Sequence, residues 1–276
     1  METKMKRRSR IEKIVRHSCL FFFIFALSIV SPERSAADDQ LDALLERTGR
    51  QTSSFLDLLS ETNCTEHVLQ EKLGENGKVV EKEASTYDYL IILSTEGGDL
   101  NLVESRIAPE NSKEHKKLHA PLLISNGFAT LFLVFHPHYS PSFQFTRDGE
   151  ESLNGRTLTR IHFQHIPGMR SPAALAVRGR EYPLDVSGMA WIDASTGTIA
   201  QLTANVDSGM EDVGLRTLHS AIRFAPVTFH DSKEAIWLPA EVNVEVETRH
   251  QHWHNTHQFS GYKRFSVNTK EQIAKQ

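Results

Sequence analysis

Apolar and polar residues alternate along most of this chain with a period of two, the pattern of strands buried on one face. The pattern is clearest near the C-terminus, where Val186, Ala190 and Ile192 share one face and Leu202 and Ala204 share the next. A turn at 194–197 separates these two strands. We predict three further strands, over 215–229, 237–254 and 259–267.

The same alternation occurs earlier in the chain, in shorter segments. Strands predicted over 68–73, 79–94 and 100–107 form an antiparallel meander, with glycine turns at 74–77 and 96–99. After a polar link over 109–119, a strand from Phe143 turns through Asp148-Gly149 toward a strand over 156–166, and a flexible edge loop follows over 167–183. About nine strands so spaced predict a mainly β (α+β) fold, either a large antiparallel sheet or a half-open β-barrel.

Two segments break the alternation and favour helices. Residues 38–60 begin with acidic N-terminal residues and place leucines at helical spacing, loosened by Gly49, which predicts one amphipathic helix. Residues 122–135 are apolar nearly all round and are stopped by Pro137. This second run is shorter than the roughly 20 residues that a membrane span requires, so we expect it to be buried over the concave face of the sheet.

The apolar run suggests two alternatives for the interior. Its side chains can simply fill the core, or they can line a cavity for an apolar ligand between the sheet and its helices. The candidate ligand contacts are the large side chains of this run and two strand tryptophans: Phe128, Leu131, Phe132, Phe135, Trp191 and Trp237.

Histidines concentrate between His250 and His257. An unbroken strand to His254 followed by a two-residue turn at Asn255-Thr256 would set His254 opposite His257, so that His252, His254 and His257 could share a zinc or other divalent ion. The alternatives are a pH-sensitive surface and an ordinary polar hairpin tip.

The N-terminus has the layout of a cleavable secretory signal over 1–37: basic residues, an apolar run of about a dozen residues from Cys19, then small residues at Ser35 and Ala37. Cys19 opens the apolar run, so it is misplaced for lipid attachment. Cleavage would leave one β-rich domain over 38–267 and a polar tail over 268–276. This mature chain has 23 basic and 32 acidic residues, a net charge of −9, and Cys64 alone.

These totals and patterns limit the classes of function. A net negative charge disfavours nucleic acid and anionic membrane surfaces as partners. A single cysteine excludes an internal disulfide. The sequence shows no nucleophile elbow, paired carboxylates or glycine-rich phosphate loop, so we expect no enzymatic activity and no resident cofactor.

The order of segments resembles the LolA-like periplasmic lipoprotein carriers. The resemblance lies in the signal, the first helix, the interrupted sheet, and the segments Gly188–Gly197, Trp237-Leu-Pro239 and Tyr262–Phe265. It implies a half-open barrel whose helices close an apolar concave face. The long polar insert and the histidine-rich segment depart from the carrier pattern.

We therefore predict an exported, periplasmic or extracellular protein without a lipid anchor. It would bind an apolar small molecule or the acyl chain of a lipidated protein. The alternatives are a cell-envelope structural or interaction module with a filled core and an envelope protein as partner, and a metal- or pH-responsive module using the His250–His257 segment.

Overall fold

The computed structural model describes residues 36–96, 99–108, 127, 131–153, 155–177, 180–210, 214–230 and 234–265. The first element of the described residues is one long helix, α1 (Ala36–Ser60), which leads directly into the first strand. The strands are β1 (Thr62–Leu73), β2 (Val79–Glu96), β3 (Asp99–Ile107), β4 (Phe143–Leu153), β5 (Arg156–His165), β6 (Ala174–Val177), β7 (Arg180–Pro183), β8 (Val186–Ile192), β9 (Ile199–Val206), β10 (Leu215–Thr228), β11 (Ala235–Thr248) and β12 (His252–Arg264).

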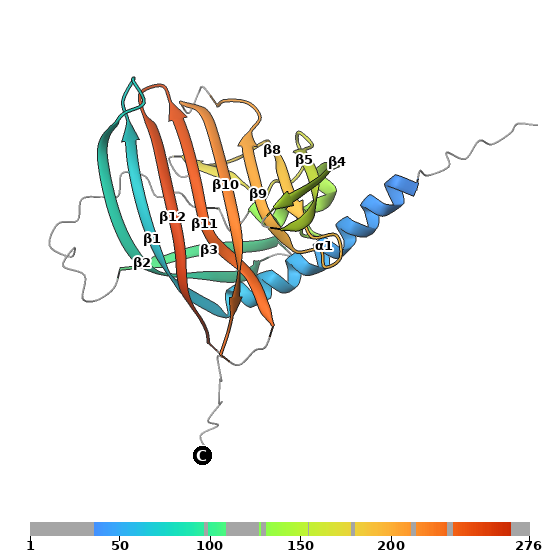
Figure 1. Cartoon of the computed structure of the whole chain (residues 1–276). Coiled ribbons are helices and arrows are strands. Elements are labelled where there is room, and N and C mark those ends of the chain that lie inside the picture. The colour runs from blue at the N-terminus through green and yellow to red at the C-terminus, as the bar shows by residue number, and fades with distance from the viewer. Residues whose placement is uncertain are drawn as a thin grey trace, which may run out of the picture. The chain divides into compact units, whose positions relative to one another are not determined.

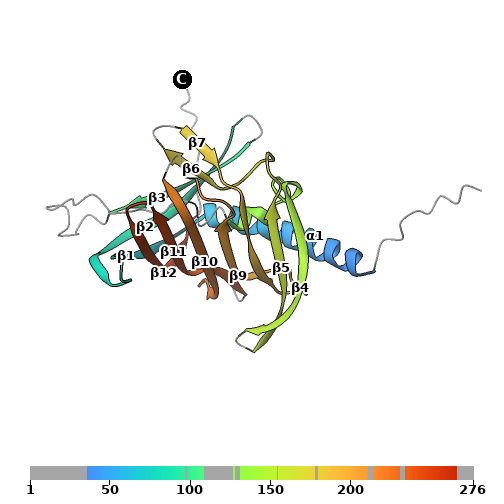
Figure 2. The ribbon, with the colours of Figure 1, turned by 90° about the horizontal axis from the view of Figure 1, so that it is seen from above.

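Ten of these strands form one antiparallel sheet in the order β3-β2-β1-β12-β11-β10-β9-β8-β5-β4. The edge strands β3 and β4 do not pair with each other, so the sheet is open. It curves strongly, and α1 runs across its concave side (Figures 1 and 2). The predicted open antiparallel sheet with an N-terminal helix is therefore confirmed.

Most of the predicted strand connections are present. The β1–β2–β3 meander is antiparallel throughout, and Gly77 and Gly197 take the positive φ that their turns require. The turn predicted at Asp148-Gly149 is wrong. The backbone there forms a β-bulge inside β4, with Gly149 at φ 98°, and the strand continues to Leu153. The predicted edge loop over 167–183 contains the two-stranded β6–β7 hairpin.

The α1 helix is continuous through Gly49 and follows the predicted amphipathic pattern. Its buried side includes Leu44, Leu56 and Leu59, which join the core of the sheet. Gly49 is buried because the helix passes close to the chain at Phe135, where an added Cβ would lie 3.2 Å from the carbonyl oxygen. Burial of this apolar stripe, at roughly 25 cal/mol per Å², holds the helix on the sheet.

Of the apolar run predicted as a helix over 122–135, the structure describes Gly127 and residues 131–135. The other residues of the run lie outside the described residues. From Phe132 to Phe135 the chain forms a short 3-10 helix, η2, whose four side chains are almost completely buried. The part that the structure describes therefore enters the core, as predicted. No helix among the described residues has the length and hydrophobicity to cross a membrane.

The candidate ligand cavity

A cavity of about 350 Å³ lies between the C-terminal half of α1 and the ends of β9, β10 and β11. We call it the α1 cavity. Its apolar wall consists of Phe55, Leu58, Phe132, Ile199, Phe224, Ile236 and Trp237. Its polar lining consists of Gln51, Thr52, Ser54, Asp57, Glu61, Gly197, Thr198 and Arg264. A volume of this size is at the lower end of the roughly 300–1,000 Å³ typical of ligand pockets.

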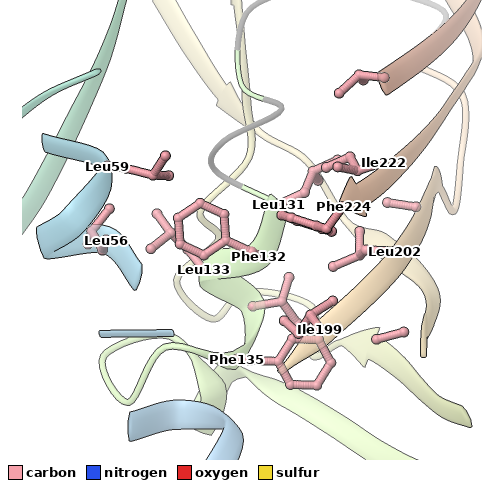
Figure 3. Packing of buried hydrophobic residues seen from close by; sticks show 14 of the residues in the cluster. Leu56, Leu59, Leu131, Phe132, Leu133, Phe135, Ile199, Leu202, Ile222 and Phe224 are labelled. Carbon is pink, nitrogen blue, oxygen red and sulfur yellow. The ribbon is translucent and has the colours of Figure 1, made fainter. Parts of the chain in front are cut away.

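Three phenylalanine rings form the inner end of the α1 cavity. Phe55 of α1 packs edge-on against Phe132, with ring centroids 4.9 Å apart, and against Phe224 of β10 at 5.9 Å. Figure 3 shows the Phe132 ring directed toward Leu56 and Leu59 of α1, while Phe224 projects from the sheet. The helix, the 3-10 turn and the sheet therefore meet at these rings.

The charged residues of the cavity are Asp57, Glu61 and Arg264. Arg264 donates to the Glu61 carboxylate at 3.0 Å, and both side chains are about half exposed. Asp57 lies in the last turn of α1, where the helix dipole disfavours negative charge and where the helix has no basic residue. Asp57 has no ion-pair partner among the described residues.

The structure places only part of the predicted ligand set at this cavity. Phe132 and Trp237 line it, and the guanidinium of Arg156 lies 4.5 Å from the Trp237 ring. Leu131 is buried in the neighbouring core. Phe128 lies outside the described residues.

Trp191 is in the wrong place for the predicted site. Inward positions of β8 are Val186, Gly188, Ala190 and Ile192, so Trp191 points to the outer face. Its indole N–H donates to Glu151 at 2.8 Å. The alternation in the sequence already implied this, because Trp191 is out of phase with Ala190 and Ile192.

Two other hollows border the described core. A gap of about 20 Å³, the inner gap, lies deeper in the concave side and shares Phe132 and Phe224 with the α1 cavity. It has room for about one water. A groove of about 460 Å³ on another side of α1 includes Phe135, but that side chain is 1% exposed and offers almost no surface. The α1 cavity contains two of the predicted ligand residues, Phe132 and Trp237, and is therefore the better candidate site.

The sequence pattern missed several cavity residues, among them Phe224, Ile236 and Arg264. Phe55 and Leu58 were recognisable as part of the apolar stripe of α1. No local signal marked the others, because they come together only when strands distant in sequence end beside the helix.

A second unpredicted feature is a buried ionic network near the other edge of the sheet. Arg106 of β3 donates from Nε to Glu66 Oε2 at 2.6 Å and from Nη2 to Glu66 Oε1 at 2.9 Å and Glu104 Oε2 at 3.1 Å. His257 Nδ1 lies 2.8 Å from Glu66 Oε1. Glu104 also accepts the backbone N–H of Gly127 at 3.0 Å. The side chains of Glu66 and His257 are fully buried.

Burial and pairing act in opposite directions on these groups. Burial alone would raise the pKa of Glu66, but hydrogen bonds from His257 and Arg106 outweigh it and lower that pKa below its ordinary value. Burial would lower the pKa of Arg106, yet Glu66 and Glu104 raise it. Nearby, burial raises the pKa of the Cys64 thiol to about 12, so that thiol stays protonated at neutral pH.

The hairpin predicted at Asn255-Thr256 is also wrong. The β11–β12 connection lies at 249–251, and residues 252–264 form one strand. His252 and His254 therefore point to the outer face, whereas His257 points inward to Glu66. The three histidines do not converge, and no group of three metal-ligating side chains occurs within the part of the chain that the structure describes.

Neither a family model nor a curated protein matches this chain. Solved structures do match. A DUF1329 family protein from Desulfovibrio piger is 12% identical, with 83% of this chain and 94% of that chain covered and a TM-score of 0.41. A Vibrio parahaemolyticus domain named for outer membrane lipoprotein sorting is 11% identical, with 82% and 94% covered and a TM-score of 0.42.

Lipoprotein LppX of Mycobacterium tuberculosis is 11% identical, with 82% and 98% covered and a TM-score of 0.22. The matches thus include the lipoprotein-sorting class named by the sequence resemblance. Because their TM-scores are below 0.5, the proposals that follow rest on the geometry of this chain.

Proposed function

We propose that this protein binds a linear apolar chain, such as the acyl chain of a lipid or of a lipidated protein, in the α1 cavity. The observation that carries the proposal is an open cavity of about 350 Å³ walled by aromatic and aliphatic side chains. Side chains such as Phe55, Leu58 and Trp237 remain partly exposed there. Transfer of a methylene from water to such a surface contributes about 0.8 kcal/mol.

The polar side chains at the cavity suit an amphiphile. Asp57, Glu61 and Arg264 are exposed or half exposed, so a polar end of the ligand can stay hydrated beside them while the apolar chain is buried. The guanidinium of Arg264 already donates to Glu61, so it does not bind a ligand carboxylate directly.

Binding would occur without chemistry. Within the described chain, the residues that line the α1 cavity include no histidine, cysteine or lysine. The buried acid and base groups of the ionic network bind one another instead of facing the α1 cavity.

We further propose that residues 1–37 direct export and are removed. The α1 helix begins at Ala36, so cleavage after Ala37 would shorten it by two residues. The exported protein would then meet its ligand outside the cytoplasm, where an acyl chain requires shelter from water.

The test uses protein purified natively, extracted with organic solvent and examined by mass spectrometry, followed by titration of the stripped protein with a fluorescent long-chain fatty acid. We expect co-purified lipid and saturable binding of the probe. Trp237→Ala should weaken probe binding about tenfold, since it removes a large aromatic contact. Trp191→Ala is the matched control, a strand tryptophan on the outer face, and should leave binding unchanged. Equal effects of the two variants would contradict this site.

A further inference from the structure

The α1 cavity ends at side chains that also bound the inner gap. Phe132 and Phe224 belong to both linings. Beyond them the inner gap reaches the concave interior, where Leu59, Ile222 and Val242 are nearly fully buried. These two aromatic rings therefore border both a ligand-sized cavity and a gap with room for about one water.

Of these rings, Phe132 is placed to act as the barrier. Its exposed fraction is 2%, it lines both spaces, and its ring contacts Phe55 in the wall of the α1 cavity. The backbone of η2 fixes where the side chain starts, so the ring can change the space behind it only by rotating about its own side-chain bonds. Phe135 comes from the same 3-10 turn but lines neither space.

We propose that Phe132 sets the length of apolar chain that the protein accepts. The ligand class is a linear saturated acyl chain whose polar end stays hydrated at the exposed mouth of the α1 cavity. The chain enters the α1 cavity and stops at the Phe132 ring, and longer chains gain nothing from their additional methylenes. This inference rests on the proposed function and adds the residue that determines its specificity.

The experiment measures dissociation constants for saturated fatty acids of increasing length, by displacement of a fluorescent fatty acid from the natively purified, lipid-stripped protein. For the natural sequence, Kd should fall about fourfold per added methylene and then level off. In Phe132→Ala, Kd should continue to fall for chains longer than the limit of the natural sequence. The longest chains should bind at least tenfold more tightly than they do to the natural sequence.

The control is Phe135→Ala, which removes an equally buried ring from the same turn and should keep the original length limit. Phe132→Leu is a milder second variant that preserves apolar packing if Phe132→Ala does not fold, and it should move the limit in the same direction by fewer methylenes. An unchanged limit in the folded Phe132 variants would overturn this inference while leaving the proposed function intact. Failure of the natural sequence to bind any fatty acid would overturn both.

Discussion

The concave face of the sheet has two halves that use the same strand pattern for different interiors. Around β5, β8 and β9, the inward positions are mainly apolar, and Ile161, Ala190 and Leu202 are completely buried there. On β1, β3 and β12 the equivalent positions include Glu66, Arg106 and His257, also buried, which pair with one another. The first half is stabilised by removal of apolar surface from water, and the second depends on matched charges.

This difference explains where the ligand cavity lies. A cavity that separated the groups of the ionic network would leave buried charges without partners, which costs several kcal/mol per ion. A gap beside apolar side chains costs only lost contacts and can be offset by an apolar ligand. The α1 cavity accordingly opens at the ends of β9, β10 and β11, away from Glu66 and Arg106.

Removal of the central cation should give the largest loss of stability. Arg106→Met leaves Glu66 and Glu104 facing each other in a buried site without their shared guanidinium. We expect a loss of about 4 kcal/mol in the free energy of unfolding, measured by urea denaturation at neutral pH.

The matched control is Arg264→Met, which breaks the exposed pair between Arg264 at the end of β12 and Glu61. That change should cost less than about 1 kcal/mol. Similar losses in the two variants would show that the buried network stabilises the fold no more than an exposed ion pair does. The distinction between the two halves would then be removed.

The sequence predicts the strands of both halves but not their chemistry. Alternation locates both β8 and β9. Ala190 and Ile192 lie two residues apart in β8, and Leu202 and Ala204 lie two residues apart in β9. In β1 the same period places Cys64, Glu66 and Val68 on one face. A carboxylate in phase with buried apolar residues was a readable signal that Glu66 needs a partner, but the partner could not be identified. Arg106 and His257 lie 40 and 191 positions away, and only sheet pairing brings them together.

The candidate site was predictable to a similar degree. Phe132 and Trp237 follow from the apolar run and the strand pattern, whereas Trp191 points outward because strand parity, not side-chain size, decides which face a residue takes. The histidine prediction failed because turn chemistry at 249–251 is weak in sequence, and shifting the turn reverses which histidines share a face. Arg264 and Ile236 join the cavity through tertiary packing alone.

A truncation in the apolar half should have the next largest effect. Leu202→Ala removes methyl groups from a position that is 0% exposed within the core cluster. We expect a loss of about 3 kcal/mol in the free energy of unfolding, from lost burial and the residual void. Ile92→Ala, at a position 50% exposed on the outer face of β2, is the control and should change stability by less than about 0.5 kcal/mol. A loss at Leu202 no larger than at Ile92 would contradict the tight packing of this half.

The smallest expected effect is on the pH dependence of stability, and in the polar half it should come from Glu66. Because the pKa of Glu66 is lower in the folded protein than its ordinary value of 4.5, ionised Glu66 stabilises the fold above that pH. The stabilisation is lost as the pH falls through the folded pKa. Glu66→Gln cannot titrate, so its free energy of unfolding should fall less steeply than that of the natural sequence as the pH decreases below about 4.5.

Urea denaturation over a pH series measures this slope. Glu150→Gln, which replaces an exposed carboxylate paired with Arg147, is the control and should keep the acid dependence of the natural sequence. Leu202→Ala should also keep it, because its loss of stability involves no proton. If Glu66→Gln retained the full acid dependence, folding would not lower the pKa of Glu66. Pairing with Arg106 and His257 would then only offset the burial of this carboxylate, and charge would not distinguish the stability of the two halves.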